Sequence, residues 1–156
     1  MRIDRRTARE ADIPFLLSLR RETMDSHLVA SGESTAEEAH LARLMYHFDC
    51  AEILIGNGHP VGLLKLRRMP AEWEVIQIQL STHFQGRGIG CSLLEELIAD
   101  AAAAGADVKL SVLKANQARR LYERLGFEVI GEDAHEYYMR RTADSSFKQK
   151  PHRGPA

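Results

Sequence analysis

The chain has 156 residues, of which 44% are hydrophobic and 28% are charged, and this balance is typical of a single soluble globular domain with one core. Its net charge of -1 gives no overall field that would attract nucleic acid or an anionic membrane, so we expect neither as a partner. No apolar run approaches the roughly 20 residues that span a membrane, and the N-terminal residues lack the apolar core of a signal peptide.

The first part of the chain predicts one strand followed by two helices. Residues 3–7 alternate and predict an entry strand. Asp12 is a good N-cap for the first helix, which Ser31-Gly32 ends. The capping box Ser34-x-x-Glu37 predicts the start of a second helix, whose apolar face recurs at helical spacing through Leu41, Leu44, Met45 and Phe48.

The next part predicts three strands joined by turns. A short strand at residues 53–55 precedes the strong turn signal Gly56-Asn57-Gly58-His59, and residues 61–68 return as the second arm of a hairpin. Residues 69–71 then turn the chain into a third strand that ends at Leu80.

A glycine-rich loop, Gln85-Gly86-Arg87-Gly88-Ile89-Gly90, follows this strand and opens an amphipathic helix that Gly105 ends. Three glycines in five residues let backbone N–H groups converge, and a helix N-terminus adds unpaired donors and the positive end of a dipole. The loop therefore indicates an anion site, or else only a tight connection. It matches neither a dinucleotide fingerprint nor a P-loop.

The last part predicts a strand at residues 108–112, a short helix from the N-cap Asn116 to Gly126, and two strands at residues 127–130 and 135–140. The whole order is β-α-α-β-β-β-α-β-α-β-β. We expect one domain over residues 1–141. The Ser-, Lys-, Pro- and Gly-rich segment 142–156 is expected to be a disordered tail.

Two motifs carry a resemblance to a known family. Gln85, Gly88 and Gly90 fill the pattern Q/R-x-x-G-x-G/A, and residues 116–127, about thirty residues later, resemble a second signature of the same family. From about Arg2 to Arg141, the chain resembles the GCN5-related N-acetyltransferases (GNAT). The resemblance departs at Thr82 and Gln117, where many relatives carry proline, but neither departure removes a functional group.

The resemblance implies an α/β fold (α+β, with a mixed sheet) whose central strands splay apart. It also implies an enzyme that transfers an acetyl group from acetyl-CoA, its co-substrate, to a primary amine of a small molecule or a protein by direct attack. A non-catalytic acetyl-CoA-binding regulatory module is the alternative. We expect a monomer or a homodimer.

By this resemblance, residues on both sides of the glycine loop hold coenzyme A. The backbone of the splayed strand pairs with the pantetheine arm, and Asn116 serves as a helix cap and a pantetheine contact. Backbone N–H groups of the loop hold the pyrophosphate. The implied cofactor-binding residues are Ile78, Leu80, Gln85, Gly86, Arg87, Gly88, Ile89, Gly90, Cys91 and Asn116.

Tyr122 aligns with the usual general acid of the family, although its place on an apolar helix face also fits a core residue. A phenol with a pKa near ~10 can protonate a leaving thiolate. The base is Glu74, unless Glu74 is a solvated strand carboxylate, and Glu22 and His47 are alternatives. The residues expected to line the acceptor site are Glu22, Met24, His47, Gln77 and Gln79.

Two cysteines, Cys50 and Cys91, form neither a disulfide framework nor a four-ligand metal site, and the seven histidines contain no H-x-x-x-H pair. We therefore expect reduced thiols, no bound metal, and a cytoplasmic location.

Overall fold

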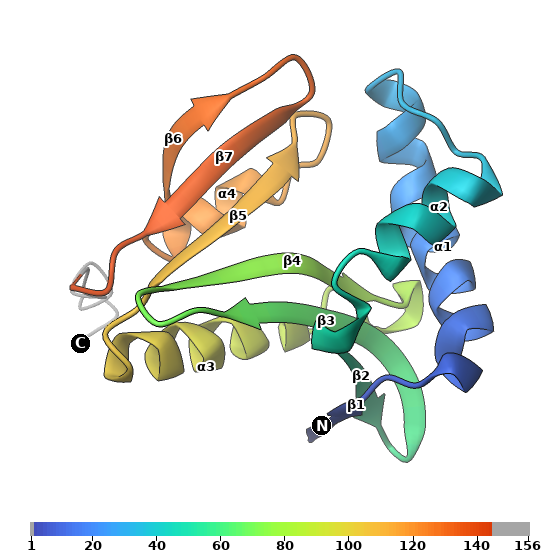
Figure 1. Cartoon of the computed structure of the whole chain (residues 1–156), viewed down its shortest axis with the longest axis horizontal. Helices are drawn as coiled ribbons and strands as arrows, with labels where there is room; N and C mark the ends of the chain where they lie inside the picture. Colours follow the sequence, from blue (N-terminus) through green and yellow to red (C-terminus); the bar gives the residue numbers. More distant parts are fainter. Residues whose placement is uncertain (1, 145–156) are drawn as a thin grey trace. The chain divides into compact units, whose positions relative to one another are not determined.

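The structure is a computed structural model that describes residues 2–144 (Figure 1). Seven strands are hydrogen-bonded in the order β1-β2-β3-β4-β5-β7-β6, and four α-helices accompany them, so the predicted α/β class is confirmed. The chain divides into two compact units. The first unit comprises the residues up to Arg67 together with Val75–Ser92, and the second comprises Arg68–Glu74 and the residues from Leu93 onward.

The first unit contains an antiparallel ladder beside two helices. Its strands are β1 (Ile3–Thr7), β2 (Ala51–Gly56), β3 (His59–Arg68) and the larger part of β4 (Glu72–Leu80), and its helices are α1 (Ile13–Ala30) and α2 (Glu37–Met45). In the register, Ile3 lies opposite Gly56, and Ala51 lies opposite Lys65. The predicted hairpin turn between β2 and β3 is confirmed, since Asn57 and Gly58 have φ of 54° and 80°.

The core of the first unit lies where α1 and α2 meet the ladder. It contains Leu16, Leu19, Leu44, Ala51, Ile53 and Leu63. Strands β3 and β4 approach closely at Gly62, where a Cβ atom would lie 2.4 Å from the backbone oxygen of Gln79. A side chain at position 62 would therefore push β4 out of place.

The second unit contains the body of α3 (Ile89–Ala103) and the strands β5 (Asp107–Leu113), β6 (Glu128–Glu132) and β7 (Glu136–Arg141). A short helix, α4 (Arg119–Arg124), connects β5 to β6. Strand β7 pairs antiparallel with β5 on one side and β6 on the other. The predicted ends of α3 and α4 are confirmed, because Gly105 and Gly126 take φ of 71° and 96°.

Two predicted helix caps, at Ser34 and Asn116, are wrong because each polar side chain bonds locally instead. Asp12 does lie at the N-cap position of α1, as predicted, but its side chain does not bond to the helix. The Asp12 carboxylate accepts hydrogen bonds from Arg6 and from the backbone N–H of Arg9, all at 2.8 Å. Ser34 accepts from the N–H of Ala36, and α2 begins only at Glu37. The Asn116 side chain accepts from the N–H of Ala118 at 2.9 Å, and α4 begins at Arg119.

The predicted apolar face of α2 is also partly wrong. Leu44 is buried, but Leu41 and Met45 are 39% and 44% exposed, and Phe48 lies beyond the helix in the 3-10 turn η2 (Phe48–Cys50). The helix stops at Met45 because Tyr46 is extended and His47 is left-handed, with φ of 50°. The second buried residue of α2 is His40, whose Nε2 lies 2.7 Å from the Asp25 carboxylate of α1.

Two further expectations concern the ends of the chain and the membrane. The tail expected at residues 142–156 lies outside the described residues from 145 onward. Within the described part, the N–H of Ala143 donates to Asp107 at 2.8 Å. No helix of the described chain is long and apolar enough to cross a membrane. The splaying of the central strands stays a prediction.

Candidate functional site

The glycine loop of the first unit has the backbone geometry of an open cradle. Gly86 and Gly88 take left-handed φ of 75° and 77°, a region that glycine enters at little cost. A Cβ atom at either position would meet nothing within 4 Å, so the space beside this backbone is open. The first backbone hydrogen bond of α3 runs from the N–H of Ser92 to the oxygen of Gly88 at 3.0 Å. The N–H groups before Ser92 therefore precede the helical ladder and face the open side of the helix start.

Side chains anchor this loop to the end of β4. The Gln85 side-chain amide donates to the backbone oxygen of Leu80 at 2.9 Å. The guanidinium of Arg87 lies over the Phe84 ring, 5.3 Å from its centroid. The hydrogen bond from Gln85 to Leu80 gives the glutamine of the motif a structural role, which is to fix the loop to the end of β4. Arg87 is held beside the loop by its cation–π contact with Phe84.

Glu22 connects α1 to the segment that leads into the loop. Its carboxylate accepts hydrogen bonds from the N–H and the hydroxyl of Thr82 at 2.6 and 2.7 Å. Thr82 begins the 3-10 turn η3 (Thr82–Phe84), which the sequence did not predict. These hydrogen bonds lower the pKa of Glu22, so the carboxylate is a weaker base than an ordinary glutamate.

Gln77 and Gln79 on β4 are both buried, at 6% and 7% exposure, and Ile76 is also buried, so both faces of the strand are covered. Both amide atoms of Gln77 and the amide oxygen of Gln79 lack a hydrogen-bond partner among the described residues. Buried amides without partners cost free energy, so these two side chains are available to hydrogen-bond a ligand or a water molecule. Ile78, between them, is half-buried.

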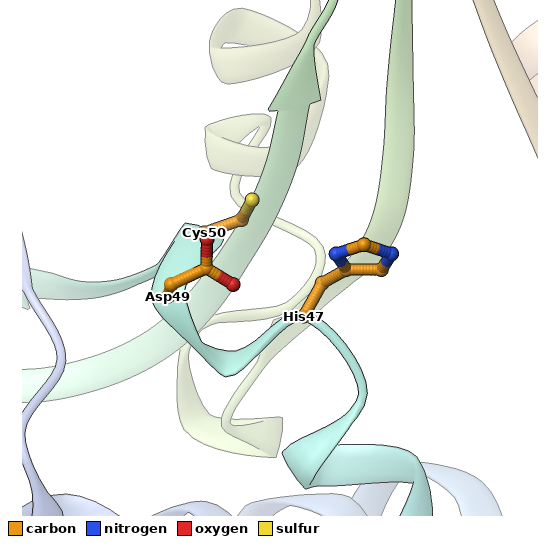
Figure 2. A group of neighbouring side chains, drawn as sticks. All are labelled: His47, Asp49 and Cys50. Atoms are coloured by element: carbon orange, nitrogen blue, oxygen red, sulfur yellow. The ribbon is translucent and has the colours of Figure 1, made fainter.

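Met24 and His47 lie in the same unit, both half-buried. Figure 2 shows His47 with Asp49 and Cys50 at the turn between α2 and β2, where their ligand atoms all lie within 4.8 Å of one another. The set has the donor types that bind a transition metal, although the sequence predicted none. The charge of Lys65 already acts on Cys50 and Asp49, and this positive charge opposes a cation at the same place.

The second unit contains the other predicted catalytic residues. Tyr122 is 8% exposed, and its ring packs edge-on against Phe127 with centroids 5.8 Å apart. Burial raises the pKa of Tyr122 to about 12. The phenol therefore stays protonated at neutral pH, but it is a weaker acid than the ordinary tyrosine assumed from the sequence. Glu74 is half-buried on β4.

Sequence reasoning missed a polar layer in the first unit. Lys65 of β3 is completely buried, and its Nζ donates to the backbone oxygens of Arg43, Leu44 and Tyr46 at 3.2, 2.6 and 2.6 Å. It thus caps the C-terminus of α2, where a cation is favoured. Arg20 of α1 is also buried. Apolar periodicity carries no signal for such residues, and alternation could not single out Lys65, because its strand neighbours Leu64 and Leu66 are buried as well.

Comparisons with known proteins agree with this geometry. A family model described as "Acetyltransferase (GNAT) family" matches residues 16–127. No curated protein matches the sequence significantly. Many solved structures match the fold of this chain.

PaiA N-acetyltransferase from Thermoplasma acidophilum, in complex with coenzyme A, is 17% identical with a TM-score of 0.70, over 91% of this chain and 99% of that chain. An acetyltransferase from Thermus thermophilus is 19% identical with a TM-score of 0.72, over 91% of this chain and 97% of that one. The ribosomal-protein-S18-alanine N-acetyltransferase from Escherichia coli is 18% identical with a TM-score of 0.67, over 93% and 96%. At these identities the structural likeness shows the fold.

Proposed function

The chain belongs to the GNAT acetyltransferase family, and from this premise we propose that it transfers the acetyl group of acetyl-CoA to a primary amine of a small molecule or a protein. In this reaction the amine nitrogen bonds to the acetyl carbon, the carbon–sulfur bond breaks, and a proton passes from the amine to a base while the thiolate gains one. The observation that carries the proposal is the open glycine loop at the start of α3.

The loop fits the pyrophosphate of acetyl-CoA. Its left-handed glycines expose backbone N–H groups, and the helix start adds the positive end of a dipole. We assign this binding to the segment from Gln85 to Cys91, with backbone contacts from Ile78 and Leu80, and a further contact from Asn116. One neighbour in this family, the Thermoplasma acidophilum enzyme, was crystallised with coenzyme A, which supports the assignment.

We assign the proton that the leaving thiolate receives to the Tyr122 hydroxyl. The phenol is protonated throughout the physiological pH range because burial raises its pKa to about 12. The same shift makes the transfer uphill, since a thiol has a pKa near ~8.5, so we expect the proton to move as the carbon–sulfur bond breaks and not before.

Glu74 is our candidate for the base that takes the proton of the attacking amine. Glu22 suits this role less well, because the hydrogen bonds from Thr82 hold its carboxylate and lower its pKa. We propose that Met24, His47, Gln77 and Gln79 line the acceptor site, where the unpartnered amides of the two glutamines offer hydrogen bonds to the acceptor or to a water.

Binding and turnover test this function separately. We expect acetyl-CoA to raise the melting temperature by mass action, and Gly88→Val to abolish the shift because valine cannot take φ of 77° at low cost. Gly32→Val is the matched control, since Gly32 has a similar φ of 72° and open surroundings but ends α1, far along the sequence from the loop. Thiol release across an amine panel then measures transfer. Acetyl-CoA binding without release for any amine would support a regulatory module instead.

A further inference from the structure

The polar layer between α1, α2 and β3 contains three positive charges that no carboxylate of residues 2–144 neutralises by direct contact. Arg20 lies on α1, Arg43 on α2 and Lys65 on β3, all within the first unit. Each lies close enough to the others for electrostatic repulsion: the charge of Arg43 acts on both Arg20 and Lys65, and Arg20 acts on Lys65. Burying like charges together is unfavourable unless an anion joins them.

Arg20 is the clearest sign that a partner belongs here. Its side chain is 8% exposed, and its Nε is buried without a hydrogen-bond partner within the described chain. Asp25 and Glu33 attract it electrostatically, but neither lies within ion-pairing distance among the described residues. A guanidinium has five donors in a planar fork that matches an oxyanion, so an unpaired buried guanidinium is an unfilled oxyanion partner.

The other polar groups of the layer already make contacts within the protein. Lys65 uses its three donors on the carbonyls at the end of α2, so it contributes charge and not a hydrogen bond. The Asp25 carboxylate is hydrogen-bonded to the Nε2 of His40 at 2.7 Å. The Nδ1 of His40 is a second buried polar atom without a partner in the described part of the chain. Arg43 is half-buried, and its guanidinium makes a cation–π contact with the Tyr46 ring, 5.6 Å from its centroid.

We propose that Arg20 and Arg43 bind an oxyanion, a carboxylate or a phosphate, carried by the amine that the protein acetylates. The acceptor is then a small anionic amine. This inference rests on the proposed function, and it deepens that function by naming the substrate class. The two guanidiniums supply planar donors, and Lys65 adds a positive charge that interacts electrostatically with both.

Matched pairs of amines test this directly with thiol release. Amino acids are compared with their carboxamides, and aminoalkyl phosphates with the corresponding amino alcohols, which separates the two sources of the oxyanion. We expect the acidic member of at least one pair type to have a kcat/KM about 10- to 100-fold higher than its neutral partner, the usual worth of hydrogen bonds to a charged group.

Arg20→Gln and Arg43→Gln should each lower this ratio by about 10-fold or more, chiefly through KM of the acidic amine, because each removes a charged donor. Arg21→Gln is the control, since Arg21 is the next residue on α1 and pairs with Glu37 at 2.6 Å on the surface. If the buried Arg20→Gln variant does not fold, the ratio measured for the half-buried Arg43→Gln variant tests the inference. Its melting temperature shows whether that variant is folded.

A neutral amine used as well as or better than its acidic partner would overturn the inference, as would an acidic preference that survives both substitutions. Failure of the function itself looks different, because then no amine releases thiol. Calorimetry with inorganic phosphate and with acetate adds a readout independent of turnover: Arg20→Gln should weaken anion binding by about 10-fold, whereas Arg21→Gln should not.

Discussion

Lys65 in the first unit and Tyr122 in the second are both buried ionisable groups, and their pKa values move in opposite directions for the same reason. Removal from water disfavours the charged form of each. It lowers the pKa of Lys65 to about 8, with help from Arg43 and Arg20, and it raises the pKa of Tyr122 to about 12.

The difference lies in what surrounds each group. Lys65 keeps its charge at neutral pH because three backbone oxygens at the end of α2 accept hydrogen bonds from its ammonium group. Tyr122 is surrounded by apolar packing such as Phe127, and it stays neutral with its proton retained. The first unit therefore holds a buried positive charge at neutral pH, whereas the second holds a buried neutral phenol.

The largest expected effect comes from removing the hydroxyl proton of Tyr122. Tyr122→Phe keeps the ring that packs against Phe127 and removes only the hydroxyl, so we expect kcat to fall by about 10²–10⁴-fold. Steady-state kinetics on a good acceptor measure the change, and calorimetry should show acetyl-CoA binding retained. An unchanged kcat, in a step limited by chemistry, would make Tyr122 a core residue whose hydroxyl has no catalytic part.

The next largest effect comes from removing the buried charge of Lys65. Lys65→Met removes the donor to three buried carbonyls, and we expect a loss of about 2–4 kcal/mol in the free energy of unfolding, measured by urea denaturation. Lys109→Met is the control, because Lys109 is 39% exposed and pairs with Glu72 at 3.3 Å, so its loss should cost under about 1 kcal/mol. Equal costs for the two variants would contradict the capping role of Lys65.

Alkaline pH separates the two groups. Between pH 8 and 10.5 the unfolded chain binds the Lys65 proton more tightly than the folded protein does, so Lys65 makes the free energy of unfolding rise with pH, by at most about 3 kcal/mol. Between pH 10 and 12 the unfolded chain loses the Tyr122 proton first, so Tyr122 makes that free energy fall, again by at most about 3 kcal/mol.

Each contribution is obtained as a difference from a variant without the group. The free energy of unfolding of the wild type minus that of Lys65→Met should rise between pH 8 and 10.5. The free energy of unfolding of the wild type minus that of Tyr122→Phe should fall between pH 10 and 12. Parallel pH profiles for wild type and a variant would show that the burial of that group does not control its proton.

The smallest effect sharpens the comparison with a group whose shift has another cause. Hydrogen bonds from Thr82, and not burial, lower the pKa of the exposed Glu22. A double-mutant cycle with Glu22→Gln and Thr82→Val should give a coupling of about 0.5–1 kcal/mol, since the pair is solvent-exposed. We also expect weaker acetyl-CoA binding in both single variants, by a few-fold, because η3 leads into the glycine loop. Additive effects would remove Glu22 from this positioning role.

Most strands and the glycine loop could be predicted from the sequence because each has a strong local signal. Alternation, turn residues such as Asn57-Gly58, and helix-ending glycines such as Gly105 depend on near neighbours only. The caps at Ser34 and Asn116 failed, and Asp12 took the N-cap position of α1 without a capping hydrogen bond. Polar side chains have several local partners of similar energy, and tertiary context selects among them.

The site was predictable only where a motif fixes backbone shape. Gly86 and Gly88 could be assigned to an open loop, but the burial of Gln77 and Gln79 could not, because alternation predicts one covered face and the strand has two. The clustering of Arg20, Arg43 and Lys65 joins three elements through their side chains, and no spacing within the sequence encodes such a meeting.

Because Lys65 is buried, the rate at which it is chemically labelled reports how often this part of the fold opens. An amine with a pKa of about 8 is among the more nucleophilic lysines at neutral pH, yet this one has no accessible surface for a thioester or an acylating reagent to reach. Acylation of Lys65 must therefore wait for α2 to detach from β3, whereas Lys109 and Lys114 react from the closed state. The ratio of these labelling rates, followed by mass spectrometry, reports how often this part of the protein opens, and a ligand that bridges α1 and α2 should slow the label at Lys65 alone.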